Sequence, residues 1–478
     1  MLSDKLIRLL KSFSKPQMNR FRKYLISPFF NENEILVRLF DLIKDNFDKS
    51  NPVKKEVKDL EKSDVWNELF ASVPYKDAQL RRLCSDLTRE AMHFLAYLEL
   101  EKNPVEEQVY LLRAINQPQL NKHFMGVVRQ TKELQHKNGY ENDGFYYSRF
   151  RMEALLQQHA DEKGGKNYGP EHIGRADFNL DCFYLINKLR HYSNMLMWKT
   201  VRSVDLSLNV FPNFLEYVRD SVYYEIPAVA IQYQIALTFL QPEEENHFNE
   251  LRALLVKHNA LFEKVELQNM YLAAQNYCAY QLNLGKLKYY KELFGIYKIL
   301  IEKEIILVDG KFATGNYKNI ITVGLMVDEP EWVEAFIKVY TDALPKSSQD
   351  NDRNYNLAKV YFHQKHYEKV IEQLREVEYK TLVYSLGGRL MLLKTYYEIK
   401  EETALDSLID SFRIFLRRNQ TISRDVRQQY LNVLRFIKKL ATTARYNKSS
   451  LSSVKKQIEE CKVLAAKKWL LEKVGELE

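Results

Sequence analysis

Glycine and proline are scarce in this chain. Its 478 residues include only 15 glycines and 12 prolines, about half the share that is usual in globular proteins. Because these two residues form most tight turns, few turns are encoded, which argues against an all-β sandwich, a barrel or collagen. Disorder is not expected, since 31 tyrosines and 25 phenylalanines supply apolar area to bury. A chain of this length is expected to form several cores or one extended array of repeats.

Cysteine is also scarce, and the few cysteines are widely separated. None forms a C-x-x-C pair. A disulfide framework or a zinc site is therefore not expected, and mostly buried free thiols in a reducing cytoplasm are the better interpretation. The four residues are Cys84, Cys182, Cys278 and Cys461.

Long apolar runs are missing as well. The uncharged run at residues 226–242 is interrupted by glutamines and is shorter than the ~20 apolar residues that a membrane span needs. We expect a buried helix there and no membrane span. Charges spread over residues 4–11 interrupt any apolar segment of a secretory signal.

Helical signals dominate what remains. The residues Ser14 to Gln17 form a capping-box pattern with proline in the first turn, which predicts a helix through about Leu25. A second capping signal at residues 31–34 precedes another helix. Leucines and Met92 recur at steps of three and four residues between Asp77 and Lys102, which predicts one long helix.

Apolar residues in the second half of the chain recur at a fixed spacing. Tyr361 and Tyr396 lie 35 residues apart, as do two further pairs on the segments that follow them. Going back by 35 residues places Ala335 on Val370, and an earlier unit around Tyr290 lies 45 residues before Ala335. The extra residues are assigned to a loop near Val308. The two further pairs are Val370 with Leu405 and Leu374 with Ile409, and the same steps place Val339 on Leu374 and Phe294 in the earlier unit.

These residues resemble the tetratricopeptide repeat, a helix–turn–helix unit of ~34 residues. Ala358, Tyr361, the turn at 365–367 and Val370 are similar to the repeat's series of small and aromatic residues. Cys278 and the turn at 284–286, followed by Tyr290 and Phe294, look like an earlier copy of that series. The whole chain also resembles uncharacterised bacterial helical-repeat proteins, for which no reaction is known. The resemblance implies a solenoid in which first helices line a groove that binds a protein or peptide.

The groove has five candidate residues if the family geometry holds. They are polar or aromatic residues of first helices, and the alternative is that they are ordinary surface residues. The candidates for partner binding are Gln275, Tyr355, Lys359, Lys394 and Tyr397.

The predicted fold is all-α, an α-solenoid of stacked antiparallel helix pairs with an N-terminal helical region. We expect an N-terminal helical domain at 1–161, a loop or linker at 162–172, and helical hairpins leading into the array at 173–265. Tetratricopeptide-like repeats are expected at 266–419, and basic C-terminal capping helices at 420–478.

The net charge of +8 is distributed unevenly. Residues 1–24 carry +6 and residues 411–478 carry +10, so the part between them carries −8. On a helix from Ser423 to about Arg445, cationic residues gather on one stripe. This stripe is interpreted as a docking face for a phosphate backbone or an acidic partner, or else as the polar outer face that a terminal repeat needs for solubility. The basic face comprises Arg417, Arg418, Arg424, Arg427, Arg435, Lys438, Lys439 and Arg445.

Motifs of catalysis are not found. The glycines at 164–169 and 310–315 lack the spacing or the Lys-Ser/Thr pair of phosphate-binding loops, and no H-E-x-x-H occurs. The sequence therefore predicts no catalytic, cofactor or metal site. It predicts a cytoplasmic, non-catalytic scaffold or adaptor that binds a protein or peptide. The alternative is a nucleic-acid-associated regulator that uses the basic C-terminal helices, and the oligomeric state is left open.

Overall fold

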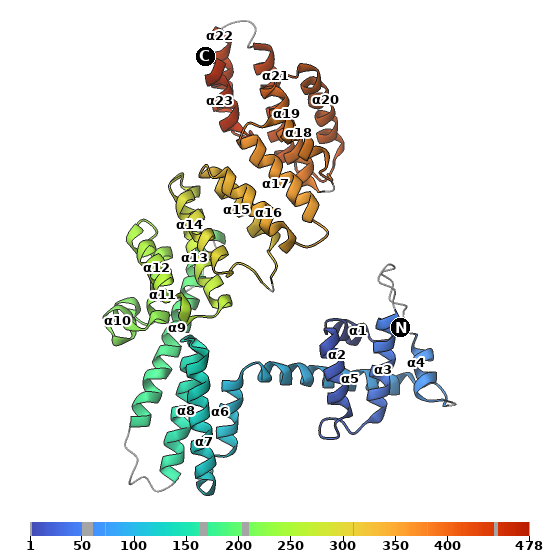
Figure 1. Ribbon diagram of the computed structural model, residues 1–478, viewed down its shortest axis with the longest axis vertical. Coiled ribbons are helices and arrows are strands. Elements are labelled where there is room, and N and C mark those ends of the chain that lie inside the picture. The colour runs from blue at the N-terminus through green and yellow to red at the C-terminus, as the bar shows by residue number, and fades with distance from the viewer. Residues whose placement is uncertain are drawn as a thin grey trace. The chain divides into compact units, whose positions relative to one another are not determined.

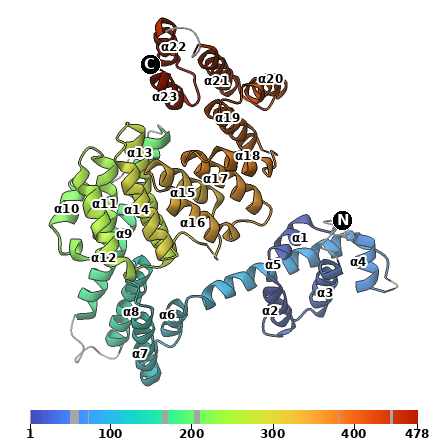
Figure 2. The same ribbon diagram turned by 45° about the horizontal axis from the view of Figure 1, so that its top comes forward.

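The computed structural model is helical throughout the residues that it describes, and these contain no strand (Figures 1 and 2). The described residues are 2–49, 61–71, 73–162, 171–202, 210–308, 310–379, 381–443 and 448–477. An isolated antiparallel bridge joins Val308 and Lys311. The predicted all-α fold is thereby confirmed. The chain divides into two compact units, one formed by Met1–His191 with Asn213–Val229 and the other by Tyr192–Pro212 with Ala230–Glu478.

The first unit begins with five helices around an aromatic core. Phe21, Phe40, Trp66 and Phe94 are all fully or almost fully buried in it. The predicted capping box is present, because the Ser14 backbone N–H donates to the Gln17 side chain at 2.8 Å and the Ser14 hydroxyl accepts from the Gln17 backbone N–H at 3.4 Å. The helices are α1 (Asp4–Lys11), α2 (Lys15–Ile26), α3 (Glu34–Lys49), α4 (Lys62–Leu69) and α5 (Asp77–Glu101).

The rest of the first unit has its own small core, to which Leu112, Phe124 and Met152 belong. α8 ends at Glu162 and α9 begins at Glu171, and residues 163–170 lie outside the described residues, so the loop and the domain division predicted at 162–172 stay predictions. The elements are α6 (Pro104–Ala114), η1 (Pro118–Leu120), α7 (Asn121–Asn138), α8 (Asp143–Glu162), the first part of α9 (Glu171–Arg202), α10 (Phe214–Asp220) and η2 (Val222–Glu225).

The second unit is a solenoid of helix pairs. Each helix from α13 to α21 packs on the next, and the first helices of successive pairs, α15, α17 and α19, also contact each other. The run at 226–242 forms α11, which is largely buried as predicted. The helices are α11 (Pro227–Leu240), α12 (Glu245–His258), α13 (Lys264–Asn283), α14 (Tyr289–Glu302), α15 (Thr314–Met326), α16 (Pro330–Tyr340), α17 (Gln349–His363), α18 (Tyr367–Arg375), α19 (Leu382–Glu398), α20 (Glu402–Arg418), α21 (Arg424–Thr443), α22 (Lys448–Glu460) and α23 (Lys467–Leu477), with the 3-10 helices η3 (Asn259–Leu261) and η4 (Thr341–Ala343) between them.

The first helices α13, α15, α17 and α19 end in the same turn, in which one residue takes a positive φ. In the turn after α17, Lys365 has φ +61°, its N–H donates to the Phe362 carbonyl, and the next N–H, of His366, donates to the Tyr361 carbonyl at 2.8 Å. This pair of bonds defines the Schellman motif. It satisfies carbonyls that the helix end leaves free, and the second helix then starts within a few residues. The equivalent residues of the other turns are Gly285, Asp328 and Lys400.

These turns give the register of the repeats, which differs from the sequence prediction. Successive turns are separated by 43, 37 and 35 residues. A constant spacing of 35 residues aligns Ala335 and Val339 with the core residues Val370 and Leu374. In the structure, however, Ala335 and Val339 are exposed. Val333 and Ile337 fill those core positions at 0 % exposure. The connection from α16 to α17 is two residues longer than the next one and contains η4, so the true register shifts by two.

No helix within the described ranges combines the length and apolar character that crossing a bilayer requires. All four cysteines are free, and three of them are buried as predicted, while Cys461 is partly exposed.

The turn after α13 predicts opposite effects for the same substitution at two glycines. Gly285 has φ +84°, so Gly285→Ala places a side chain in a left-handed conformation at a cost of about 1 kcal/mol. Gly295 lies in the exposed middle of α14 with open space around it, so Gly295→Ala gains about 1 kcal/mol of helix propensity. Hydrogen exchange of α13 and α14 is expected to become faster by roughly fivefold in the first variant and slower in the second. A shift in the same direction for both variants would contradict the assignment of this turn.

Candidate binding face of the repeat array

The predicted groove residues lie on three first helices. Gln275 is on α13, Tyr355 and Lys359 are on α17, and Lys394 and Tyr397 are on α19. Lys359 and Lys394 occupy equivalent positions, six residues before the positive-φ residue of their turns. Tyr355 is buried and the other four are partly buried. The face that carries these residues, together with the adjoining residues of α15, is called the inner face below.

A polar cluster that sequence reasoning missed joins α15, α17 and α19 on this face. Asp352 of α17 is 0 % exposed and accepts a hydrogen bond from the Tyr384 hydroxyl of α19. The Lys318 ammonium of α15 lies 3.3 Å from the same carboxylate and 3.3 Å from the Tyr384 hydroxyl oxygen. Lys318 and Tyr355 are equivalent residues, because each lies ten residues before the positive-φ residue of its turn. A constant spacing of 35 residues does not align them, so Lys318 is not among the predicted groove residues.

Polar atoms of this cluster are left without partners. The second oxygen of Asp352, Oδ2, and the amide oxygen of Asn356, Oδ1, are buried and accept no hydrogen bond among the described residues. The Asn356 amide nitrogen donates to the Asp352 backbone carbonyl at 2.8 Å, which holds the side chain in place. Asp352, Asn356 and Lys359 follow one stripe of α17, since they are four and three residues apart. An unsatisfied buried acceptor typically costs ~1–3 kcal/mol, so a folded chain gains when a ligand satisfies it.

Two lysines of the inner face form no ion pair with any described residue, although nearby carboxylates favour their charged forms. The Lys359 ammonium forms no hydrogen bond or ion pair with any described residue and lies 4.9 Å from the centre of the Tyr355 ring. Burial, and secondarily the charge of Lys318, lowers the pKa of Lys359 to about 8, while Asp352 opposes the shift. Burial also lowers the pKa of Lys394 to about 8. A desolvated ammonium of this kind attracts an anionic group strongly.

The C-terminal helix covers Lys394 and Tyr397. The Trp469 ring of α23 lies 5.3 Å from the Lys394 ammonium and 5.4 Å from the Tyr397 ring centre. The indole N–H donates to Glu398 of α19 at 2.9 Å. Lys473, which is 4 % exposed, lies 2.9 Å from the same glutamate. Two of the five predicted groove residues therefore contact the chain's own last helix.

The predicted basic face is divided between internal and free cations. Arg427 donates to the backbone carbonyls of Asn419 and Ile422, and Lys439 donates to Gln457 at 2.6 Å. Lys438 is exposed, 3.8 Å from Asp406. Arg445 lies outside the described residues. The exposed arginines without a hydrogen-bond or ion-pair partner among the described residues are Arg417, Arg418, Arg424 and Arg435.

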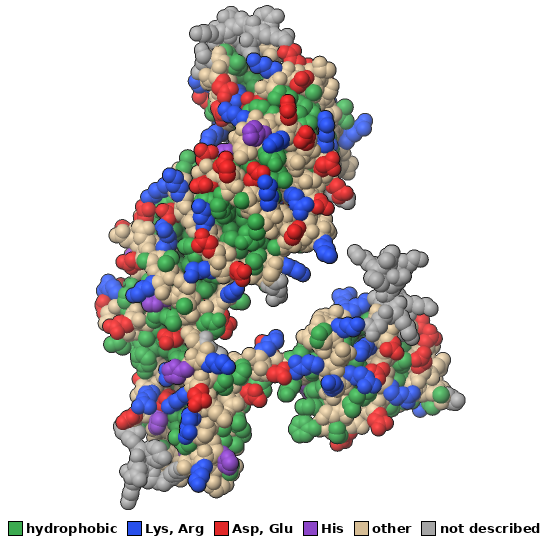
Figure 3. All heavy atoms as spheres, viewed as in Figure 1, with side chains coloured by type: hydrophobic (Ala, Val, Ile, Leu, Met, Phe, Trp, Pro, Cys, Tyr) green, Lys and Arg blue, Asp and Glu red, His purple; other side chains and the backbone are tan. Residues whose placement is uncertain are grey.

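Charges of both signs interleave elsewhere, as the face drawn in Figure 3 shows. In the basic N-terminal segment, Arg20 pairs with Glu101 at 2.7 Å and Arg22 with Asp41 at 2.8 Å. The positive charge of this segment is thus partly neutralised by acidic side chains of α5 and α3.

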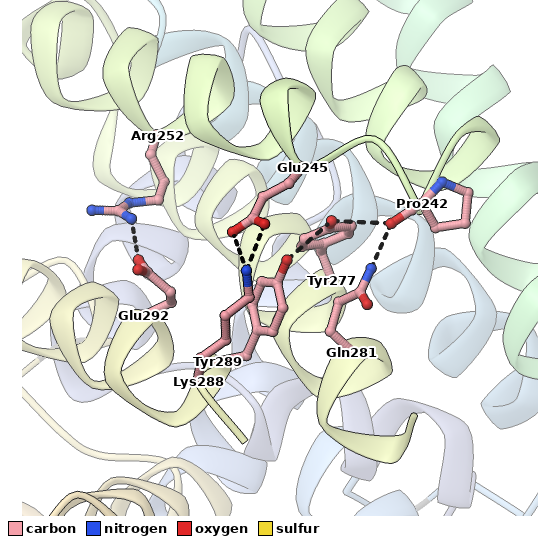
Figure 4. A network of polar contacts seen from close by, with 8 residues as sticks. All are labelled: Pro242, Glu245, Arg252, Tyr277, Gln281, Lys288, Tyr289 and Glu292. Carbon is pink, nitrogen blue, oxygen red and sulfur yellow. Dashed lines mark hydrogen bonds and ion pairs between the residues drawn. The ribbon is translucent and has the colours of Figure 1, made fainter. Parts of the chain in front are cut away.

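A second polar network joins α12, α13 and α14 (Figure 4). The Pro242 carbonyl accepts from the Tyr277 hydroxyl at 3.1 Å and from the Gln281 amide at 2.5 Å. Lys288 bonds both oxygens of Glu245, at 2.6 and 2.8 Å. An Arg252–Glu292 ion pair also joins α12 to α14. This network connects α12 to the first repeat, and it too contains a buried acceptor without a hydrogen-bond partner, the Gln281 amide oxygen.

The described residues form an all-helical, solenoid-like fold in which neighbouring helix pairs pack on one another. No family model matches the chain, and no match is found among curated proteins or solved structures. Among the described residues there is also no group of three or more His, Cys, Asp or Glu side chains that would hold a metal ion.

The lowered pKa values predict how stability depends on pH. Below pH 8 both lysines are charged in the folded chain, which bears the full cost of their desolvation. Between about pH 8 and the ordinary value of 10.5 the folded chain loses these protons before the unfolded chain does, so stability rises with pH. Lys359→Met and Lys394→Met are each expected to raise Tm by about 2–4 °C at pH 7 and to remove part of the rise between pH 8 and 10.

Thermal unfolding followed by circular dichroism at pH 7 and pH 10 measures this effect. Lys291→Met, at an exposed lysine of α14, is the matched control and is expected to leave Tm unchanged at both pH values. Equal Tm changes in all three variants would contradict the burial of the two inner-face lysines.

A close contact between α17 and α19 fixes Tyr355 in place. A Cβ at Gly387 would lie 2.0 Å from the Tyr355 hydroxyl oxygen. Gly387→Ala is therefore expected to destabilise the pair of helices by about 1–3 kcal/mol, measured by hydrogen exchange of α17 and α19. In a Tyr355→Phe background the hydroxyl is gone, so the loss should fall by about half. An equal loss of stability in both backgrounds would show that the methyl group introduced by Gly387→Ala does not contact the Tyr355 hydroxyl.

Proposed function

We propose that the chain is a tetratricopeptide-like solenoid that acts as a non-catalytic scaffold or adaptor in the cytoplasm. It binds a protein or peptide partner on the inner face. The observation that carries this proposal is the cluster around Asp352, where a buried carboxylate oxygen and a partly buried lysine lack partners. Buried polar groups without hydrogen-bond partners lower the stability of a fold, and a bound partner that supplies the missing interactions is favoured for that reason.

The rest of the array supports this assignment by contrast. Interior positions of the array are apolar, as Ala358 of α17 and Val370 and Leu374 of α18 are, at 0–1 % exposure. An array whose inner face served only packing would gain by placing apolar residues at positions 352 and 359 as well. Hydrophobic stacking thus accounts for the solenoid, and partner binding accounts for the polar cluster.

Nucleic acid is the second candidate partner, and the exposed arginines near the end of α20 and along α21 favour it. Polyanion binding of this kind weakens steeply with salt. The protein-binding proposal is preferred because Arg427 and Lys439, which belong to the predicted basic face, are engaged within the chain.

Site-specific photo-crosslinking tests the proposal. Thr322 is an exposed residue of α15 at the position equivalent to Lys359, and Glu372 is an exposed residue of the second helix α18. With benzoylphenylalanine at position 322, a native lysate is expected to yield a discrete cross-linked protein. The same residue at position 372 should yield none, and Lys359→Met should reduce the yield at position 322 several-fold.

Three outcomes would count against the proposal. They are cross-links from position 372 alone, cross-links that Lys359→Met leaves unchanged, and recovery of nucleic acid alone. In the last case, loss of the complex in Arg424→Glu and Arg435→Glu variants and at high salt would support the second candidate instead.

A further inference from the structure

The contact of α23 with α19 provides an internal example of what the inner face holds. Lys394 and Tyr397 are a lysine–aromatic pair whose members lie three positions apart on α19. Trp469 of α23 contacts both of these side chains. The carboxylates of Glu472, three residues after Trp469, and of Glu398 both favour the charged form of Lys394. A helix with an aromatic residue followed three positions later by a carboxylate therefore matches this pair of side chains.

The same pair recurs one repeat earlier. Lys359 and Phe362 of α17 lie 35 residues before Lys394 and Tyr397, and Phe362 is partly exposed. The Lys394 ammonium lies 5.7 Å from the Phe362 ring centre, so the two pairs adjoin. At neither pair does a carboxylate of the described chain form an ion pair with the lysine: Glu472 and Glu398 act on Lys394 through their charge, as Asp352 acts on Lys359. The surface that α23 covers thus continues onto a similar lysine–aromatic pair, whose side chains are only partly buried.

We propose that the partner of the inner face docks as a helix beside α23, with an aromatic side chain against Phe362 and a carboxylate on the Lys359 ammonium. The aromatic residue and the carboxylate are three positions apart, as Trp469 and Glu472 are in α23. This inference rests on the proposed function and specifies the groups that meet Lys359 and Phe362; the buried acceptors of Asp352 and Asn356 require separate hydrogen-bond donors from the partner. It follows from charge complementarity and from the continuity of the surface with the α23 contact.

The spacing has a physical basis. Residues three apart on a helix lie on the same side, so one face of the docked helix reaches a lysine and an aromatic residue that are themselves three apart on α17. The ring buries apolar area, which supplies affinity, and the carboxylate pairs with a desolvated ammonium, which supplies specificity. A neutral helix would leave Lys359 buried and unpaired, and it would bind more weakly for that reason.

Selection from a displayed library of helical peptides tests the inference on the full chain. The library randomises the exposed positions of a stable helix, and the enriched peptides are then measured by fluorescence anisotropy. We expect enrichment of Trp, Phe or Tyr followed three positions later by Asp or Glu. Replacing that acid by its amide should weaken binding about tenfold, and Lys359→Met in the chain should weaken binding by a similar factor. The two losses together should be far from additive, because they remove the same contact.

Control variants separate a lost contact from a lost fold. Lys359→Arg keeps the positive charge and should retain most of the affinity, while Lys291→Met should bind like the parent chain. Circular dichroism and Tm of each variant confirm that the array is folded. Anisotropy measured together with size-exclusion chromatography shows whether a second copy of the chain competes for the site.

The outcomes distinguish the inference from the function on which it rests. If no peptide is enriched and the cross-linking at position 322 also fails, both the function and the inference are overturned. If peptides are enriched that bind the inner face but lack the aromatic–acid pair, or bind Lys359→Met equally well, the inference alone is overturned. Occupation of the site by a second copy of the chain would likewise overturn it.

Discussion

The four helix pairs from α13 to α20 depend on one type of backbone turn. A first helix ends, one residue takes a positive φ, and two hydrogen bonds close the helix end so that the second helix returns alongside. Without this reversal each pair would be extended and would have no apolar face to offer its neighbour. Glycine provides the turn without strain at Gly285, whereas the equivalent residues Asp328, Lys365 and Lys400 take the same φ because stacking of the array fixes it.

The fold was largely predictable from the sequence because its signals are local. The capping box at Ser14, the long helix that begins at Asp77 and the buried run that became α11 follow from periodicity and composition, and the structure contains each of them. The repeat register was only partly predictable. A constant spacing aligned Ala335 with the core, and Val333 lies there instead, because the length of a connection leaves no periodic mark in a single sequence.

The inner face shows the limit of prediction from one sequence more sharply. Lys359 and Lys394 were recognised as first-helix residues, but their burial and the covering of Lys394 by α23 depend on contacts between distant segments. Nothing in the sequence distinguishes Asp352 from Asp350, the other acidic residue in the first turn of α17. The importance of Asp352 comes from Lys318, 34 residues earlier, and Tyr384, 32 residues later, and only packing of three helices brings these side chains together.

The unequal spacing of the turns has a consequence for recognition. In an array of identical repeats a helical ligand can shift by one unit and find the same surface again, so several bound alignments coexist. Here the units differ by up to eight residues, and only one of the turns' first helices carries a buried aspartate. If the proposed ligand moved by one repeat toward α15, it would meet Thr322 in place of Lys359 and no buried aspartate, so we expect it to bind in a single alignment.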